Sequence, residues 1–238
     1  MTTARAFRGF RFPAEVILWA VRWYLAFPVS HRDLEATLAD RGVFVDHVTL
    51  YRRVQRFAPE LEKRVRRHLR PCRGPWHVDE TFVRVGGGWR YLYRAVDGTG
   101  RTIDFLLSAT RDKKAAERFL RKALQKEPLL APDRIGTGCV GPDPPAIAAT
   151  RKAGLLARTP IHYVTKHLQQ GIESDHFRVT KNMPRIGGFR SFGTARRTIQ
   201  GFEAMLWLRK GFGFAGAWMC DQNRLLALCF GLLEVNKA

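Results

Sequence analysis

The stretch that most constrains the fold is residues 74–108, which read GPWHVDETFVRVGGGWRYLYRAVDGTGRTIDFLLS. It holds three runs rich in β-branched and aromatic residues: 76–85, 89–96 and 101–107. Three glycines separate the first two runs, and Asp97-Gly98-Thr99-Gly100 separates the last two. Connections of this kind are strong hairpin signals. The pattern therefore predicts three consecutive antiparallel strands.

One carboxylate, Asp79, lies inside the first run among Trp76, Val78, Phe82 and Val83. Because buried acids are rare unless they are paired, one interpretation is a residue on an edge strand or on the solvent side of the sheet. The other interpretation is a metal ligand on the central strand of a catalytic sheet. Convergent carboxylates there can bind divalent cations that assist phosphoryl transfer.

The charge of the chain points to a polyanionic partner. Lys and Arg number 41 against 21 Asp and Glu, a formal net charge of +20. A charge of this size favours nucleic acid, with an acidic membrane surface or a solvated basic surface as the alternatives. Since the basic residues lie among aromatic residues along the whole chain rather than in one tail, nucleic acid is the preferred interpretation.

The four cysteines form no C-x-x-C pair and have no metal-ligand spacing to the seven histidines. A zinc site is therefore not expected, whereas reduced thiols in a cytoplasmic protein are. The N-terminus has no apolar segment typical of a signal peptide. The apolar run 16–25 is short and contains Arg22, so no membrane span is expected.

Apolar spacing and capping residues predict helices over 13–27, 31–41 and 47–57. Ser30 with Asp33 forms a capping-box pattern, Gly42 ends the second helix, and Asp46 caps the third. A short helix, a glycine-containing turn and a second helix are typical of a helix-turn-helix. The alternative is a small helical bundle with a basic surface.

The third of these helices would bury Val48, Leu50 (or Tyr51) and Val54. Its outward face would then carry side chains suited to phosphates and base edges: Thr49, Arg52, Arg53, Gln55 and Arg56. Residues 59–73 follow as a basic helix or linker that tracks phosphates. A domain boundary is expected near residues 71–74.

The remaining elements are predicted as a helix 111–126, a strand 134–137, a helix 146–156, a strand 161–164, and helices beginning near 169, 194 and 224. With the three strands before them, this is the order of an α/β, RNase H-like fold. In that fold, acids lie on the first strand, at the end of the fourth strand and on a late helix. Trp89, Tyr91 and Tyr93 alternate along one strand face, and core packing is favoured over a base-stacking platform.

Blocks such as WHVDETFVRVGGGWRYLYRAVDGTGRTIDFLLS, IESDHFRVTK and GFRSFGTARRTIQGFEAMLWLRKG span nearly the whole chain. Through them the chain resembles bacterial insertion-sequence transposases of the cointegrate-forming insertion sequence six family. The resemblance implies a helix-turn-helix region and basic linker (1–70), an RNase H-like D-D-E catalytic core (71–212) and a helical tail (213–238). It also implies Mg²⁺ or Mn²⁺ as cofactor.

In the resemblance, the first catalytic Asp falls on Asp79 and the Glu on Glu173, which are the expected metal ligands. The second Asp is expected directly after Thr137, where this chain has Gly138. The spacing from Gly138 to Glu173 matches the family, so the length is kept and the carboxylate is missing. Asp143, five residues further on, is the candidate substitute, and Asp133 and Asp104 are weaker ones.

The resemblance implies binding of terminal inverted repeats and target DNA, metal-dependent cleavage and strand transfer, with catalysis impaired at Gly138. Two alternatives stay open: a catalytically dead DNA-binding relative acting as repressor or inhibitor, and a metal-dependent nuclease. His176 is either a partner of the site or a surface residue. Further DNA-contact candidates are Arg178, Lys181, Arg196 and Arg197. A homo-oligomer in the bacterial cytoplasm, nucleoid-associated when bound, is expected.

Overall fold

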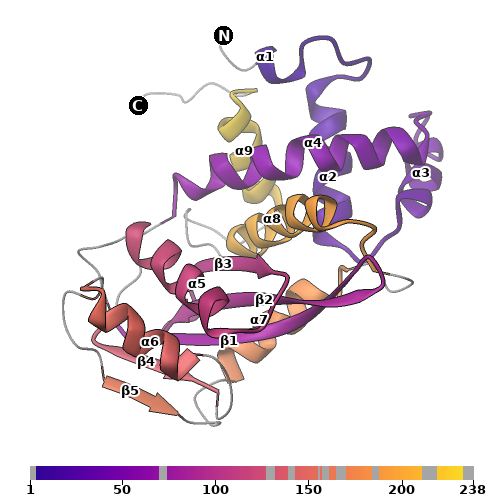
Figure 1. Ribbon diagram of the computed structural model, residues 1–238. Helices are drawn as coiled ribbons and strands as arrows, with labels where there is room; N and C mark the ends of the chain where they lie inside the picture. The colour runs from indigo at the N-terminus through magenta and orange to yellow at the C-terminus, as the bar shows by residue number, and fades with distance from the viewer. Residues whose placement is uncertain are drawn as a thin grey trace, which may run out of the picture. The chain divides into compact units, whose positions relative to one another are not determined.

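The computed structural model describes residues 4–69, 74–126, 132–138, 143–154, 156, 161–164, 170–183, 188–210 and 219–232 (Figure 1). The chain divides into two compact units. Unit 1 comprises Met1–Arg70, Lys181–Ile186 and Ser191–Ala238, and unit 2 comprises Pro71–Thr180 and Gly187–Arg190. None of the described helices is both long and apolar enough to cross a membrane.

Unit 2 is built on a five-stranded sheet with the order β3-β2-β1-β4-β5. Its strands are β1 (Trp76–Val85), β2 (Gly88–Asp97), β3 (Thr102–Ser108), β4 (Arg134–Thr137) and β5 (Ile161–Val164). The first three are antiparallel neighbours, and β4 and β5 run parallel to β1. All five predicted strands are therefore present, and β1 is central. This mixed α/β architecture is consistent with an RNase H-like core.

The β1–β2 hairpin turns through Gly86 and Gly87, which have φ of +59° and +77°. Two successive residues with positive φ are what a two-residue type I′ hairpin turn requires, and glycine adopts them without strain. The same strands correct one prediction. Tyr93 is fully buried as expected, but Trp89 is 58% exposed and does not belong to the core.

Helices cover the two faces of the sheet differently (Figure 1). On one face, Val78 packs with Phe119 of α5 (Lys113–Lys126) and Ile147 of α6 (Asp143–Lys152). On the other face lies α7 (Gln170–Thr180), which contacts β1 and β2. Since side chains alternate along a strand, the residue after Val78 points toward α7.

Unit 1 is helical in the part of the chain that the structure describes. Its helices are α1 (Ala4–Phe7), α2 (Ala14–Ala26), α3 (His31–Ala39), α4 (His47–Arg66), α8 (Phe192–Arg209) and α9 (Met219–Phe230). The predicted capping box of Ser30 and Asp33 begins α3. The carboxylate of Asp46 accepts hydrogen bonds from the backbone N–H groups of Val48 and Thr49 at the start of α4.

The length of α4 corrects the predicted end at residue 57. The helix continues to Arg66 with Pro59 inside it. Proline removes one backbone hydrogen bond and crowds the preceding turn, which disfavours a helix interior. Burial outweighs this cost, because Phe57, Ala58 and Leu61 on either side of Pro59 are almost completely buried. A second correction concerns Val48, which was expected to be inward and is 43% exposed.

Helix α8 packs against α2 and α4 in unit 1. Gly201 allows this packing, since a Cβ there would lie 2.6 Å from Leu25 Cδ1 and 2.8 Å from Ala58 Cβ. Close contact therefore assigns α8 to the same unit as the N-terminal helices. The sequence interpretation had placed this segment in the catalytic core, together with the strands.

Candidate functional site

The face of the sheet beneath α7 carries the candidate catalytic acid. Asp79 lies near the middle of β1, the central strand. Its strand partner on β2 is Arg94, which is fully buried. On α7, Ile172, His176 and Val179 are buried. The central position and the cover by α7 exclude the edge-strand interpretation of Asp79.

The surroundings of Asp79 favour its protonated form. The pKa of its carboxyl group is raised to about 6, mainly by burial and to a smaller extent by the negative charges of Glu80 and Glu173. A backbone hydrogen bond at Glu80 and the charge of Arg111 lower it. Arg111 forms an ion pair with Glu80, the residue that follows Asp79 on β1. A divalent cation between Asp79 and Glu173 would relieve this repulsion, which fits the chemistry of a metal-binding pair.

Helix α7 presents two groups in the neighbourhood of Asp79. The charge of Glu173, which is exposed, acts on Asp79. His176 Nδ1 lies 3.7 Å from Asp79 Oδ2. Burial and, to a smaller extent, the charge of Arg94 lower the pKa of His176 to about 3, so its imidazole is neutral at pH 7. The surface interpretation of His176 is therefore wrong, because its side chain is enclosed beside Asp79.

The register between β1 and β4 gives the position of Gly138 relative to Asp79. His77 pairs with Gly136 and Val78 pairs with Thr137 in the parallel ladder. The pairing and β4 both end at Thr137, so Gly138 directly follows the strand, as Asp79 directly follows Val78; neighbouring strands lie about 5 Å apart. An aspartate at position 138 would therefore complete a carboxylate pair on this face. Glycine leaves that position without a ligand.

The candidate substitutes for the missing acid have different positions. Asp104 is fully buried and bonded to Lys122 of α5 at 3.1 Å, on the face opposite Asp79. Asp133 is exposed and precedes β4, near the strand end opposite Gly138. These positions make neither residue a replacement. Asp143 is the first residue of α6, and its side chain lies outside the described residues.

A glycine in β4 shows a close approach that sequence reasoning did not identify. A Cβ on Gly136 would lie 2.7 Å from Cε2 of Tyr163, so the tyrosine ring crosses β4 at this point. The ring meets His77 edge-on, with ring centroids 6.2 Å apart. Glycine inside a strand is a signal for such an approach, and that signal was available in the sequence. The pair forms an aromatic border two residues from Asp79.

The described residues supply few possible metal ligands. Among the described residues, no three or more His, Cys, Asp or Glu side chains are grouped to hold a metal ion. Asp79 and Glu173 supply two carboxylates that suit a hard divalent cation, and position 138 supplies none.

Three of the DNA-contact candidates on α4 are engaged within unit 1. The Thr49 hydroxyl donates to Asp46 Oδ2 at 2.6 Å as part of the helix cap. The Arg53 guanidinium stacks over the ring of Phe10 at 4.1 Å. Gln55 Nε2 donates to the Thr198 hydroxyl of α8 at 2.8 Å. These contacts hold the side chains in place and reduce what they can offer to a ligand.

The remaining candidates are more accessible. Arg52 and Arg56 of α4 and Arg196 and Arg197 of α8 are exposed in unit 1. Lys181 in unit 1 is partly buried, and Arg178 is exposed on α7 in unit 2. The structure thus brings the α4 and α8 arginines into one unit. Sequence reasoning had assigned these arginines to two different domains.

Comparison with known proteins gives a consistent family. The family model DDE_Tnp_IS240, described as a DDE domain, matches residues 74–212. The transposase for insertion sequence-like element IS431mec of Staphylococcus aureus is 34% identical over 204 residues, which is 86% of this chain and 88% of that protein. The transposase for insertion sequence element IS257 in transposon Tn4003 of Staphylococcus aureus is equally similar over the same shares.

Proposed function

Because the chain belongs to the bacterial insertion-sequence DDE transposases of the insertion sequence six family, we propose that it binds the terminal inverted repeats of an insertion sequence. The DDE domain and the transposase relatives support a role in DNA transposition in general. The proposed recognition element is a helix-turn-helix of α3 and α4, with Gly42 at a φ of +74° in the connection. The exposed Arg52 and Arg56 of α4 support this proposal.

The proposed catalytic residues are Asp79 and Glu173, acting in cleavage and strand transfer. The observation that carries this proposal is the environment of Asp79. This carboxylate is half-buried on the central strand, and burial and the charge of Glu173 raise its pKa. DDE transposase domains generally use divalent metal ions, which stabilise the attacking and leaving oxygens of phosphoryl transfer. Mg²⁺ or Mn²⁺ is the proposed ion, held by these two side chains.

We further propose that catalysis is impaired because Gly138 supplies no carboxylate. A second candidate function follows from the same observation, namely a DNA-binding relative that occupies inverted repeats as a repressor or as an inhibitor. Such a protein, in mixed oligomers or homo-oligomers, would compete for the inverted repeats. This competition does not need a complete metal site. The resemblance over the N-terminal helices, which a nuclease does not need, favours both candidates over a metal-dependent nuclease.

The test is a strand-transfer assay on inverted-repeat DNA with Mg²⁺, comparing the natural protein with Gly138→Asp. Joining of ends by the variant alone would support a decayed transposase with the second acid at position 138. Joining by the natural protein would refute impairment, and Asp143→Ala would then identify the substitute. Cleavage without joining would indicate a nuclease. Repeat binding by both proteins, with neither cleavage nor joining, would indicate the DNA-binding relative.

A further inference from the structure

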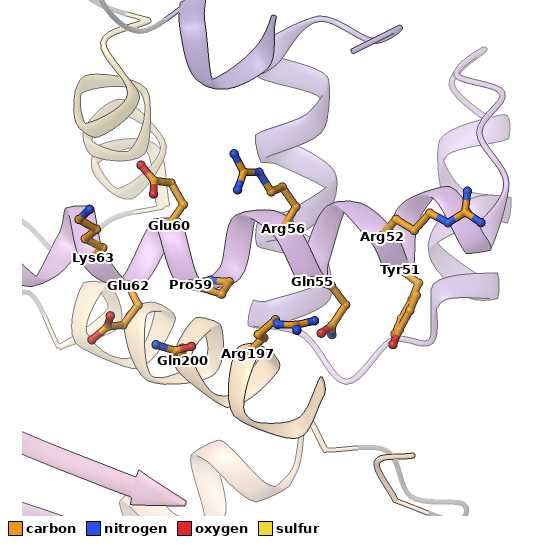
Figure 2. Close-up of a pocket in the computed structure, with 10 residues that line it drawn as sticks. All are labelled: Tyr51, Arg52, Gln55, Arg56, Pro59, Glu60, Glu62, Lys63, Arg197 and Gln200. Carbon is orange, nitrogen blue, oxygen red and sulfur yellow. The ribbon is translucent and has the colours of Figure 1, made fainter. Parts of the chain in front are cut away.

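A groove of about 770 Å³ lies between α4 and α8 in unit 1 (Figure 2). Its charged lining includes Arg52, Arg56 and Lys63 from α4 and Arg197 from α8. In Figure 2, Arg197 extends from α8 toward α4. Sequence-distant helices therefore contribute positive charge to one cavity, although no single sequence motif contains these residues.

The acids in the groove lining are already neutralised from within α4. Glu60 accepts a hydrogen bond from Arg64 Nε at 2.6 Å, and Glu62 is paired with Arg66. Both arginines are fixed by other packing as well, since Arg64 stacks over the Phe230 ring and Arg66 over the Trp207 ring. The two carboxylates thus do not cancel the charge of the groove cations.

The groove cations have no such partners in the part of the chain that the structure describes. Within the described residues, no carboxylate lies within 4.0 Å of the cationic groups of Arg52, Arg56, Lys63 or Arg197. Four unneutralised cations facing one cavity repel one another, and an anion that bridges them relieves the repulsion. Their exposed positions also leave the guanidinium and ammonium donors available for hydrogen bonds.

The spacing of these cations suits a phosphodiester strand. Arg52, Arg56 and Lys63 recur at intervals of four and seven residues, which keeps them on one face of α4. From Arg52 to Lys63 the helix rises about 16 Å, the distance over which one strand of B-DNA advances by about five phosphates. Arg197 faces this row from α8, with neutral donors Tyr51 and Gln200 also lining the cavity.

We propose that the α4–α8 groove binds the DNA phosphate backbone, with Arg56 and Arg197 contacting it from its two sides. This inference rests on the proposed DNA-binding function and adds to it a composite site that includes α8. In this site Arg197 acts as a phosphate contact, while Gln55 has a structural role through its hydrogen bond to Thr198. Phosphate contacts fix register on the duplex and carry no base information.

The test measures how affinity for a short fluorescein-labelled duplex of arbitrary sequence depends on salt. Each phosphate contact contributes about 0.9 to the slope of log K against log salt concentration. Arg56→Gln and Arg197→Gln should each reduce the slope by about 0.9, and the double variant by about 1.8. Arg197→Lys should retain the slope, because it keeps the charge.

The matched control is Arg224→Gln, which removes the same charge from an exposed position on α9 that does not line the groove. Far-ultraviolet circular dichroism and thermal melting confirm that each variant is folded. If Arg224→Gln and Arg197→Gln change the slope equally, the groove is not a specific phosphate contact. The same conclusion follows if the slope stays unchanged in folded groove variants. If the natural protein binds no duplex, both the groove proposal and the proposed DNA-binding function are refuted. If strand transfer is absent but the groove variants still reduce the salt slope, only the catalytic proposal fails.

Discussion

Replacing Gly201 by alanine tests whether α8 belongs to the helical unit. The added methyl group would lie 2.6 Å and 2.7 Å from the two Cδ atoms of Leu25, and 2.8 Å from Ala58 Cβ. Leu25 and Ala58 are both fully buried, so neither can turn into solvent. The helices must therefore move apart or the side chains must leave their preferred rotamers.

The magnitude follows from two opposing effects. Alanine is favoured over glycine inside a helix by about 1 kcal/mol. Overpacking a well-packed core costs typically about 1–3 kcal/mol, and three contacts below 3.0 Å point to the upper end of that range. The expected net loss in the free energy of unfolding is therefore about 1–2 kcal/mol, which lowers Tm by about 2–4 °C for each kcal/mol.

Gly193→Ala is the matched control on the same helix. Gly193 is exposed, and a Cβ there would have no neighbour closer than Arg197 Nη2 at 4.0 Å. This substitution should stabilise the protein by about 0.5 kcal/mol, since only the helix preference changes. Urea unfolding followed by circular dichroism measures both variants. Equal stabilisation by Gly201→Ala and Gly193→Ala would refute the packing of α8 on α2 and α4.

Three further predictions concern local contacts. Asp46→Ala removes the cap of α4 and should lower the midpoint of urea unfolding, whereas Asp40→Ala, at an equally exposed position that caps no helix N-terminus, should have little effect. Burial lowers the pKa of His31 to about 4. The contribution of His31 to the free energy of unfolding should therefore be constant above pH 6.5 and fall by at most about 3 kcal/mol as pH drops to 4. A fall in stability equally large in His31→Phe would contradict this. Gly136→Ala should cost about 1–3 kcal/mol by displacing the Tyr163 ring, and a double variant with Tyr163→Leu that shows no recovery in thermal melts would exclude that cause.

Elements defined by local chemistry were predictable from the sequence. The capping box of Ser30 and Asp33 and the turn at Gly86 and Gly87 each depend on residues a few positions apart. The order of strands and helices was predictable for the same reason. Position 138 could be identified because the resemblance fixes its spacing to Glu173, and the β1–β4 pairing ends one residue before it, at Val78 and Thr137.

Features that depend on distant packing were not predictable. Local sequence rules predict that the helix ends before Pro59. The helix continues to Arg66 because the neighbours of Pro59 on α4 are buried. No pattern in residues 47–57 indicates that Arg53 stacks on Phe10 or that Gln55 bonds to Thr198. The place of α8 is decided by contacts of Gly201 with residues that are far away in the chain. Asp79 and Glu173 are proposed as metal ligands because of the electrostatic environment of Asp79 and the family to which the chain belongs.

The packing of α8 on α4 has a consequence for synthesis of the protein. α4 ends at Arg66 and α8 begins at Phe192, 126 residues later. At ribosomal rates of about 5–20 residues per second, about 6–25 s separate the two helices. During that interval the apolar surface of α4 around Ala58 has no cover from α8. A ribosome-bound chain therefore lacks the finished groove, and a product truncated before residue 192 never acquires it.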